Sequence, residues 1–420
     1  MDFSIIGGGI AGLYCALQLA KKYPKADIQI LERYKDLGGR ISTYRTKNNK
    51  IHYESGAGRF HKDHTLLRGL INEYGLTEFP LSHELYYMDK EIKEIVPNHF
   101  EASLESWLSE FGRLSKATLA EHTIGSLLEK TFGPKGRDLT IQFPYWAELY
   151  TLRADLGIKS FEGEMSGHGK FYAVKEGFDQ LISRLVADLK KHGVKIQTSC
   201  KVIDIQKTED GFFLEVEGNK EKTKEKTKEK EVLKSKKVIL AVHPTALKNF
   251  TLLNKKLPLL NQVAMEPLCR VYCTFPLIKG KPWFQGIPRF STNSEIRYFI
   301  PIREDQGTVM ISYTDGKDTL PIDALHKKLG DIGLGKHLTN CCRDLFPTHT
   351  IPDPLTTTYH HWAKGASYWL PGNYDPVTSS KESLQPIPAL DLFICGEGFS
   401  LRQAWIEGAL ENTCDLLRRL

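Results

Sequence analysis

The start of the chain combines short apolar runs, glycine turns and an amphipathic segment. Residues 2–6 form an apolar run that predicts a strand, and this run ends at a cluster of glycines. The next segment carries apolar residues every three or four positions, which predicts a helix with one apolar stripe facing a sheet. Residues 28–31 form a second apolar run. The opening of the chain therefore predicts strand, helix and strand, as in an α/β fold.

The hydrophobic pattern along the rest of the chain predicts further elements. Helical spacing recurs at 64–74, 102–156, 181–189, 322–329, 336–346 and 403–411. Strand-like runs occur at 80–97, 171–178, 194–198, 200–205, 212–216, 238–242, 268–275, 296–302, 308–313 and 391–395. Their order predicts two discontinuous domains. We expect an α/β dinucleotide-binding domain from residues 1–78, 170–255 and 380–420, and a mixed α+β substrate domain from residues 79–169 and 256–379.

The glycine run after the first strand has the spacing G-x-G-x-x-G. Gly7 allows the tight turn, Gly9 lets a pyrophosphate approach bare backbone, and Gly12 lets the helix lie close to the strand. The N-terminus of that helix, which includes Ala11, would direct N–H groups and a partial positive charge at a phosphate. The second strand ends at Glu32, whose carboxylate can accept both hydroxyls of an adenosine ribose. The arrangement predicts a dinucleotide site.

A second glycine pair follows Glu32. Residues 32–43 read E-x-x-x-x-x-G-G-R-I-x-T. This segment resembles one found in FAD enzymes of the flavin-containing amine oxidase superfamily, the monoamine and polyamine oxidase-like enzymes, and not in nicotinamide dehydrogenases. Tyr34 stands where the family often has an arginine near the adenine. The resemblance implies cofactor contacts from Glu32, Arg33, Gly38, Gly39 and Arg40.

Two further segments resemble the same family. Residues 51–61 are similar to the segment that runs under the flavin ring, where small residues permit close approach. Residues 391–411 are similar to the family's closing strand, G-E turn and helix, whose N-terminus would stabilise the negative charge of a reduced flavin. The family also has an adenine-side valine and a tryptophan beneath the ring. The resemblance implies contacts from Gly56, Ala57, Gly58, Arg59, Val202, Trp362, Gly396, Glu397, Ala404, Trp405 and Ile406.

The family resemblance also implies a fold and a reaction. The fold is a Rossmann-type, glutathione-reductase-like FAD domain with a mixed α+β substrate domain. In the reaction, a small neutral amine gives a hydride to flavin N5, the imine is hydrolysed to an aldehyde, and O2 reoxidises FAD with release of H2O2. Ser367 stands where members with covalent flavin carry a cysteine, so non-covalent FAD is expected.

Three residues are expected to act on the substrate. Monoamine-oxidase-like members hold the amine between two aromatic rings, which correspond here to Tyr368 and Trp405, and such a pair can align the amine and exclude water. Arg270 stands where the family usually has a lysine that holds a water beside N5, and a guanidinium is planar and never deprotonated. Both rings can instead be core residues. Arg59 can contact the flavin or form a salt bridge. His61 can lie at the substrate entrance or in a solvated loop.

Composition and charge narrow the class of protein. The chain has 420 residues, of which 41% are hydrophobic and 26% charged, as in a globular protein. No apolar run is long enough to span a membrane and the chain opens on a strand, so a cytoplasmic protein is expected. The net charge of +6 comes mainly from residues 220–237, with nine lysines and four glutamates. They predict a charged flexible loop at 218–236, or alternatively a tether to an anionic surface.

The remaining candidates for chemistry are weak. The eight cysteines have no metal-ligand or disulfide spacing and are expected to be buried thiols. His360 and His361 would point to opposite faces of a strand, so no metal is expected. A nucleic-acid partner is not expected, and the oligomeric state stays open. Two rivals to an amine oxidase remain: an FAD-dependent desaturase or protoporphyrinogen-oxidase-like enzyme, and a catalytically weak flavoprotein with a binding role.

Overall fold

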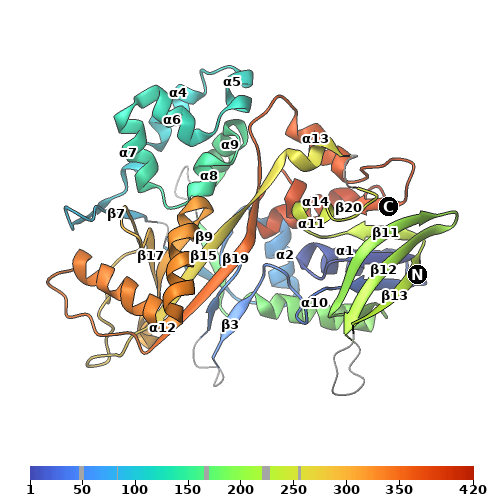
Figure 1. The fold of residues 1–420 in the computed structure, drawn as a ribbon, viewed down its shortest axis with the longest axis horizontal. Coiled ribbons are helices and arrows are strands. Elements are labelled where there is room, and N and C mark those ends of the chain that lie inside the picture. The colour runs from blue at the N-terminus through green and yellow to red at the C-terminus, as the bar shows by residue number, and fades with distance from the viewer. Residues whose placement is uncertain (47–51, 83, 165–169, 220–227, 254–256) are drawn as a thin grey trace. The chain divides into compact units, whose positions relative to one another are not determined.

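The computed structural model describes residues 1–46, 52–82, 84–164, 170–219, 228–253 and 257–420. The chain divides into two compact units, each assembled from several segments of the sequence, and each is described by itself (Figure 1). The first unit comprises Met1–Leu81, Phe171–Met265 and Tyr374–Leu420. The second comprises Ser82–Lys170 and Glu266–Asn373.

A five-stranded parallel sheet forms the centre of the first unit. In spatial order its strands are β10 (Lys195–Gln197), β2 (Ile28–Leu31), β1 (Phe3–Ile6), β14 (Lys237–Leu240) and β20 (Leu392–Ile394). Every side chain of β1 and β2 is buried. A strand buried on both faces favours apolar residues, which explains the mostly apolar runs in the sequence. The two polar exceptions, Ser4 and Gln29, are buried and form a hydrogen bond with each other, in which Nε2 of Gln29 donates to Oγ of Ser4 at 2.8 Å.

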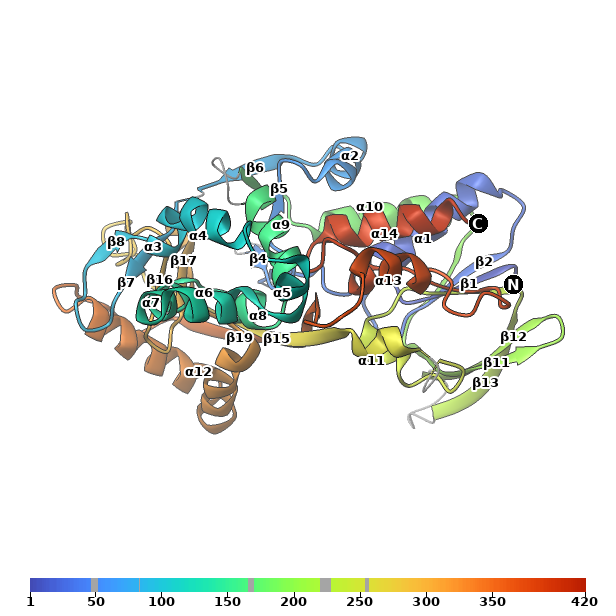
Figure 2. The same ribbon diagram turned by 90° about the horizontal axis from the view of Figure 1, so that it is seen from above.

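Helices from both ends of the chain pack side by side on this sheet. Helix α1 (Ile10–Lys22) lies against α14 (Ile406–Leu417) and α10 (Asp179–Lys191), as Figure 2 shows. The buried side of α1 includes Leu13, Leu17 and Ala20, three of the residues that give the apolar stripe of the sequence. The N-terminal and C-terminal segments therefore share one hydrophobic core.

Smaller elements complete the first unit. Two strands pair as β3 (Thr43–Arg45) and β4 (His52–Glu54), and three more form a sheet in the order β5 (Phe60–His61), β9 (Phe171–Val174) and β6 (Glu78–Leu81). A third sheet contains β11 (Cys200–Thr208), β12 (Gly211–Asn219) and β13 (Lys228–Ser235). The other helices are α2 (Thr65–Glu73), α11 (Pro244–Leu247), α13 (Pro376–Ser383) and the 3-10 helices η1 (Pro258–Asn261) and η4 (Glu397–Phe399).

The charged loop predicted at 218–236 is wrong for part of its length. Residues 228–235 form strand β13, which pairs antiparallel with β12 along its whole length. Leu233 pairs with Leu214 and Lys230 forms a salt bridge with Glu215, so cross-strand contacts hold a segment that its composition marks as solvated. Residues 220–227, which carry most of the Lys/Glu/Thr repeat, lie outside the described residues.

The second unit contains a seven-stranded mixed sheet. Its strands, in spatial order, are β19 (Thr356–Trp369), β15 (Val263–Thr274), β18 (Thr308–Asp315), β17 (Tyr298–Arg303), β16 (Phe290–Thr292), β7 (Tyr86–Met88) and β8 (Ile95–Pro97). Most neighbouring strands are antiparallel, but β16 and β7 are parallel. The fold is thus mixed α/β, with one parallel sheet and one large mixed sheet.

Helices of the second unit form a cluster and one long element. The cluster contains α3 (His99–Ala102), α4 (Leu104–Phe111), α5 (Lys116–Glu121), α6 (Ile124–Phe132), α7 (Pro134–Gln142), α8 (Trp146–Tyr150) and α9 (Ala154–Glu164). Short 3-10 turns are η2 (Glu304–Gln306) and η3 (Gly316–Asp318). The two helices predicted between 322 and 346 are the two halves of α12 (Thr319–Leu345), which meet at a kink where Gly330 has a non-helical φ of +66° and ψ of −177°.

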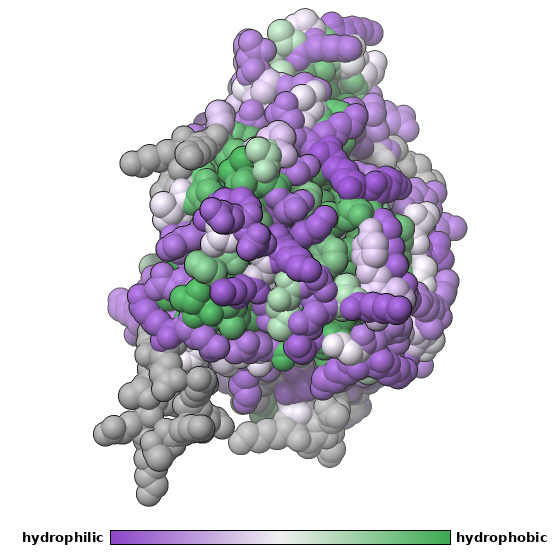
Figure 3. Space-filling model, turned by 90° about the vertical axis from the view of Figure 1, so that its right-hand side faces the viewer, coloured by the Kyte–Doolittle hydropathy of each residue, from purple (hydrophilic) through white to green (hydrophobic). Residues whose placement is uncertain are grey.

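The surface and the cysteines complete the description of the fold. The face drawn in Figure 3 is mostly hydrophilic, with separate hydrophobic patches. Among the described residues, no helix combines the length and the apolar character that crossing a membrane requires. All eight cysteines are described and all are free thiols, six of them buried.

Candidate functional site

The first glycine turn joins β1 to α1, and two of its glycines are required by the protein's own packing. Gly7 has a φ of +111°, and a Cβ atom there would stand 2.4 Å from the carbonyl oxygen of Ala241. A Cβ atom on Gly12 would stand 2.0 Å from the carbonyl oxygen of Gly7. Any larger residue at these positions would push the helix and sheet apart.

Gly9 differs, because no contact with a described residue requires a glycine there. Its φ of −76° and ψ of 178° are ordinary for any residue. The nearest described atoms that a Cβ would meet, in Gly38 and Gly39, are 4.0 Å away. Gly9 is the N-cap of α1, and no side-chain hydrogen bond caps this helix end. The bare backbone and the N–H groups of α1 thus leave a place that fits a phosphate group.

Glu32 stands at the end of β2, beside the same turn. Its carboxylate is buried and accepts hydrogen bonds from the backbone N–H groups of Gly8 at 2.7 Å and Tyr34 at 2.8 Å. A carboxylate offers about four lone-pair sites, so acceptors remain for ribose hydroxyls. The N–H of Cys200 donates to the carbonyl of Glu32 at 2.8 Å, which ties β11 to this end of the sheet. Val202, the predicted adenine-side residue, lies on β11.

The second glycine turn lies against the first. The N–H of Gly38 donates to the carbonyl of Gly8 at 2.8 Å. A Cβ atom on Gly39, which has a φ of +61°, would stand 3.3 Å from the Cα of Gly9. The two turns therefore meet at the backbone that a pyrophosphate would contact. Arg33 is placed differently: it is exposed, and its guanidinium lies 4.8 Å from the ring centroid of Tyr34.

An ion pair links the second turn to the C-terminal segment. A guanidinium nitrogen of Arg40 lies 2.8 Å from Oε2 of Glu397, whose side chain is only 5% exposed. The other carboxylate oxygen of Glu397 accepts the N–H of Ala404 at 2.9 Å. A Cβ atom on Gly56 would stand 2.1 Å from the carbonyl oxygen of Arg40. Three segments far apart in the sequence, each chosen by its resemblance to a flavin-binding segment, therefore meet within the first unit.

The C-terminal helix begins later than its pattern predicts. The prediction starts it at residue 403, whereas α14 starts at Ile406 with Trp405 as its N-cap. Ala404 has a φ of +65°, which interrupts a right-handed helix. The side chain of Trp405 makes no capping hydrogen bond, so the positive end of the α14 dipole can face an anionic group. Gly396, with φ +127°, turns the chain beside Ala11 of the first helix.

Glu407 in the first turn of α14 serves a neighbouring helix. Its carboxylate is 1% exposed, and its two oxygens accept the N–H groups of Leu66 at 2.9 Å and Leu67 at 2.8 Å. Leu66 and Leu67 lie in the first turn of α2, so Glu407 satisfies N–H groups that have no partner within that helix. The motif glutamate thus fixes α2 against α14, a role that the sequence pattern did not indicate.

An aromatic and cationic cluster surrounds Trp405. The ring of Phe171 stacks with it at a centroid distance of 6.0 Å, and His64 meets it edge-on at 4.9 Å. The guanidinium of Arg59 lies 4.5 Å from the centroid of Phe171 and 5.6 Å from that of Trp405. Phe171 and His64 were missed as site candidates, because neither belongs to a recognised motif. The pairing of Phe171 with His61 across β5 and β9 brings Phe171 to this place.

The two histidines beside this cluster are buried and neutral. Nδ1 of His64 accepts the backbone N–H of His61 at 3.2 Å, and Nδ1 of His61 accepts that of Asp63 at 3.3 Å. Each neutral ring therefore carries its proton on Nε2. Burial lowers the pKa of His64 to about 3, with the positive charges of Arg402 and Arg59 adding to the effect. The pKa of His61 is lowered by burial as well, so the expectation of a solvated loop histidine is wrong.

Arg270 lies in the second unit, on β15. It stands opposite Tyr313 of β18, and its guanidinium lies 5.2 Å from the centroid of that ring. Burial alone would lower the pKa of Arg270, but the hydroxyl groups of Tyr272, Tyr313 and Tyr145 outweigh it, and the net pKa is raised. A permanent positive charge is thus held among tyrosines, on a planar guanidinium rather than on the compact ammonium of a lysine.

Tyr368 and Trp362 lie on β19 of the same unit. Tyr368 is 8% exposed and Ser367 is fully buried, while Trp362 is partly exposed. A Cβ atom on Gly365 would stand 2.8 Å from the side chain of Leu268, so glycine there lets β19 lie close to β15. Tyr368 and Trp405 belong to different units, and their pairing around an amine stays a prediction. All predicted cofactor residues other than Trp362 lie in the first unit.

A parallel sheet, an uncapped helix at a glycine turn and an acid at the next strand end are typical of a dinucleotide-binding α/β protein. Comparison with known families is more specific. The chain belongs to the family described as flavin containing amine oxidoreductase, whose model matches residues 10–415. The family resemblance drawn from the sequence motifs is therefore confirmed, and the flavin of this family implies FAD.

Individual relatives are distant and partial. An L-amino-acid oxidase of Demansia vestigiata is 23% identical over 239 residues, which cover 49% of this chain and 45% of that protein. An L-amino acid oxidase of Cerastes cerastes is 34% identical over 95 residues, covering 22% and 18%. An uncharacterized protein, R188, of Acanthamoeba polyphaga mimivirus is 37% identical over 59 residues, covering 14% and 12%. The matches thus span less than half the length of these curated relatives.

Proposed function

We propose that this chain is an FAD-dependent oxidoreductase that oxidises the C–N bond of an amine with O2 as acceptor. The observation that carries the proposal is Gly9. Neither its backbone angles nor its neighbours within the described chain require glycine, yet it faces the uncapped start of α1 and the second glycine turn. A pyrophosphate bound close to the backbone would explain why this position has no side chain.

The residues of the first unit fit each part of such a cofactor. N–H groups of α1 and the backbone of Gly9 would hold the pyrophosphate, Glu32 would accept the ribose hydroxyls, and the uncapped start of α14 would face the redox-active ring. Bound FAD would supply the acceptor for a hydride from the substrate. We propose non-covalent binding in a glutathione-reductase-like Rossmann domain, because Ser367 offers no thiol at the family's attachment position.

We further propose that the substrate is an amine carrying a carboxylate, such as an L-amino acid. Arg59 places a positive charge beside Trp405 and Phe171, where it would attract a carboxylate, while the aromatic rings would hold the substrate's apolar part. The names of two relatives, both L-amino-acid oxidases, support the same class. His64 would stay neutral beside this site because its pKa is about 3, so it would add no charge that repels an ammonium group.

Two measurements test this proposal. A visible spectrum of the purified protein, followed by denaturation, should show a yellow protein that releases free FAD. Anaerobic mixing should then bleach the flavin with an amino acid, for example L-phenylalanine, more readily than with phenethylamine, which lacks only the carboxylate. Bleaching by the amine alone would reject the amino-acid assignment.

The rival functions give different results in the same experiment. Bleaching only by a polycyclic substrate would favour a desaturase or protoporphyrinogen-oxidase-like enzyme. A yellow protein that no substrate reduces would favour a binding role. As a matched variant, Arg59→Gln should raise KM for the amino acid at least about tenfold, equivalent to about 1.4 kcal/mol, and leave KM for the amine nearly unchanged.

A further inference from the structure

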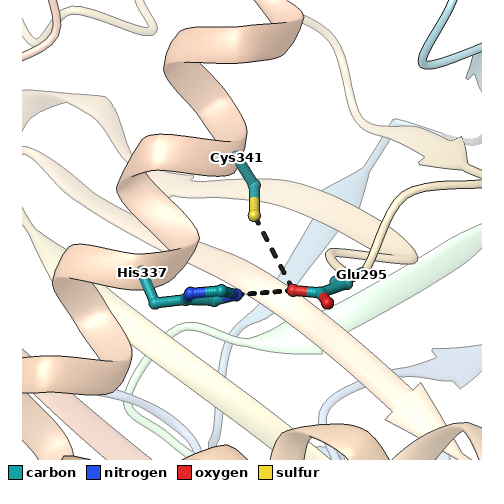
Figure 4. Close-up of side chains that lie close together, drawn as sticks. All are labelled: Glu295, His337 and Cys341. Atoms are coloured by element: carbon teal, nitrogen blue, oxygen red, sulfur yellow. Dashed lines mark hydrogen bonds and ion pairs between the residues drawn. The ribbon is translucent and has the colours of Figure 1, made fainter.

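Three potential metal ligands come together in the second unit, and none of them is among the residues assigned above. They are Glu295, His337 and Cys341, and the ligand atoms that they offer all lie within 4.8 Å of one another. Figure 4 shows His337 and Cys341 on successive turns of α12, with Glu295 reaching towards both from the segment between β16 and β17. The spacing of four residues places the imidazole and the thiol on one face of the helix.

The contacts centre on a single oxygen. Nε2 of His337 lies 2.5 Å from Oε2 of Glu295, and Sγ of Cys341 lies 3.9 Å from the same oxygen. In a tetrahedral zinc site, metal–ligand distances of about 2.0–2.3 Å put the ligand atoms about 3.3–3.8 Å apart. The observed distances lie on either side of this range. The Glu295 side chain is half exposed, so a rotation about its own bonds can open the space for an ion.

We propose that Glu295, His337 and Cys341 bind a divalent transition metal ion, with Zn²⁺ as the best match. Thiolate, imidazole and carboxylate together suit a borderline-soft ion, whereas Mg²⁺ and Ca²⁺ prefer oxygen ligands alone. Water would complete the coordination, since the cluster is open to solvent.

One face of the C-terminal half of α12 packs in the core of the second unit, and the candidate metal ligands lie on the other face. Leu334, Leu338, Cys342 and Leu345 are buried in the core of the second unit. The neighbouring Cys342 is fully buried, whereas Cys341 and His337 are partly exposed. A bound ion would therefore join the C-terminal half of α12 to the β16–β17 segment and stabilise this unit by mass action.

The same helix provides a matched comparison. His326 and Asp331 also form a histidine–carboxylate pair, with Nε2 of His326 2.8 Å from Oδ1, but no cysteine of the described residues lies close enough to complete a group of three ligands with them. If His337 and Glu295 formed only a surface ion pair, neither pair would bind a metal ion. If they form a metal site, only the pair near Cys341 would bind a thiophilic ion.

The test uses the 420-residue protein and Co²⁺ as a spectroscopic substitute for Zn²⁺. We expect one Co²⁺ per chain, visible bands of tetrahedral symmetry and a near-ultraviolet sulfur-to-cobalt charge-transfer band, all displaced by Zn²⁺ and not by Mg²⁺ or Ca²⁺. Cys341→Ser should abolish the charge-transfer band, and His337→Ala and Glu295→Gln should each weaken Zn²⁺ binding at least about tenfold. Zn²⁺ should also raise the Tm of the wild-type protein and not that of Cys341→Ser.

Two control variants distinguish this site from metal binding at a surface ion pair or at an unrelated thiol. His326→Ala removes the matched ion pair, and Cys414→Ser removes a partly exposed thiol of the first unit. Both should bind Co²⁺ as the wild-type protein does. Equal loss of binding in a control variant, or full retention of the charge-transfer band in Cys341→Ser, would overturn the proposal. A circular dichroism spectrum identical to wild type would show that each variant has folded.

Discussion

The two units of the chain hold their candidate residues in different ways. In the first unit the key contacts involve the main chain: Gly7, Gly9 and Gly12 make the turn, and Glu32 accepts backbone N–H groups. In the second unit the candidates are side chains on long strands, such as Arg270 against Tyr313. Substitutions at these main-chain contacts of the first unit should therefore act on folding and cofactor affinity, and substitutions of the strand side chains of the second unit should act on reaction rates.

The difference matters for what a sequence can reveal. A glycine required by a close backbone contact leaves a fixed spacing in the sequence, which can be found without a structure. The position of a side chain on an antiparallel sheet depends on register and bulges. The pairing of β15 with β18 shifts register between Val271 and Tyr272, next to Arg270. Such a shift cannot be predicted from the local sequence pattern.

The largest expected effect contrasts two glycines of the first turn. Gly12→Ala would place a Cβ atom 2.0 Å from the carbonyl oxygen of Gly7. Relieving this overlap should lower the free energy of unfolding by about 3 kcal/mol. Gly9→Ala meets nothing closer than 4.0 Å among the described residues, so the protein should fold with less than about 1 kcal/mol lost, yet bind FAD much more weakly.

Denaturant unfolding of the flavin-free proteins, paired with FAD titration by fluorescence, measures both quantities. The contrast fails if Gly9→Ala binds FAD as the wild-type protein does, since the space at Gly9 would then hold no phosphate. It also fails if Gly12→Ala is as stable as Gly9→Ala.

A smaller loss of stability is expected at Glu407. The variant Glu407→Gln keeps one acceptor oxygen but turns an NH2 group towards an N–H of α2, at a position that is 1% exposed. One buried donor would remain unsatisfied, which should cost about 2 kcal/mol. Thermal and denaturant unfolding measure this cost. Glu411→Gln, one turn later on α14 and partly exposed, should cost much less, and equal costs would show that Glu407 does not hold α2.

The buried histidines predict a loss of stability in acid. The pKa of His64 is about 3 in the folded protein, below the ordinary value of 6.5. As pH falls below 6.5 the unfolded chain binds a proton that folded His64 does not, so stability falls with pH until about pH 3. At pH 5.5 this one group should cost about 1.4 kcal/mol relative to pH 7.5.

His64→Asn retains an acceptor for the N–H of His61 and cannot titrate, so it should reduce this loss. The loss will persist in part, because burial also lowers the pKa of His61 and His360. Denaturant unfolding at pH 7.5, 6.5 and 5.5 measures the dependence, with the exposed His349→Asn as control. A pH dependence as steep in His64→Asn as in wild type would contradict this assignment.

Much of the first unit could be predicted from the sequence. The strands around Gly7, the acid at Glu32 and the meeting of both chain ends follow from motif spacing and apolar periodicity, which reflect buried parallel strands. The start of α14 could not be predicted, because the positive φ of Ala404 depends on its hydrogen bond with Glu397. Strand β13 was missed for a related reason, since pairing with β12 overrides its charged composition.

Less of the candidate chemistry could be predicted. Phe171 and His64 reach Trp405 only through strand pairing and helix packing between distant segments. The cluster of Glu295 and Cys341 joins a loop to a helix, so the ligand spacing cannot be recognised along the chain. Sites made of main-chain contacts leave local patterns, whereas sites made of side chains from several elements require the fold.

The smallest expected effect concerns Arg270, where the second unit should affect rate and not stability. A lysine at this position would give a compact, strongly hydrated ammonium with three donors, whereas the arginine is planar and makes a cation–π contact with Tyr313. If a water held here assists the reaction with O2, Arg270→Lys should speed reoxidation several-fold, which corresponds to about 1 kcal/mol of activation free energy. Stability should change by no more than about 1 kcal/mol, the value of the lost cation–π contact.

Stopped-flow mixing of dithionite-reduced enzyme with O2 measures this step without knowledge of the substrate. Arg303→Lys, at a partly exposed ion pair with Asp305 in the same unit, is the matched control and should leave the rate unchanged. An unchanged rate in Arg270→Lys would separate Arg270 from the oxygen reaction. A large loss of stability would instead place it among residues that hold the fold, and the distinction between the two units would no longer apply to this position.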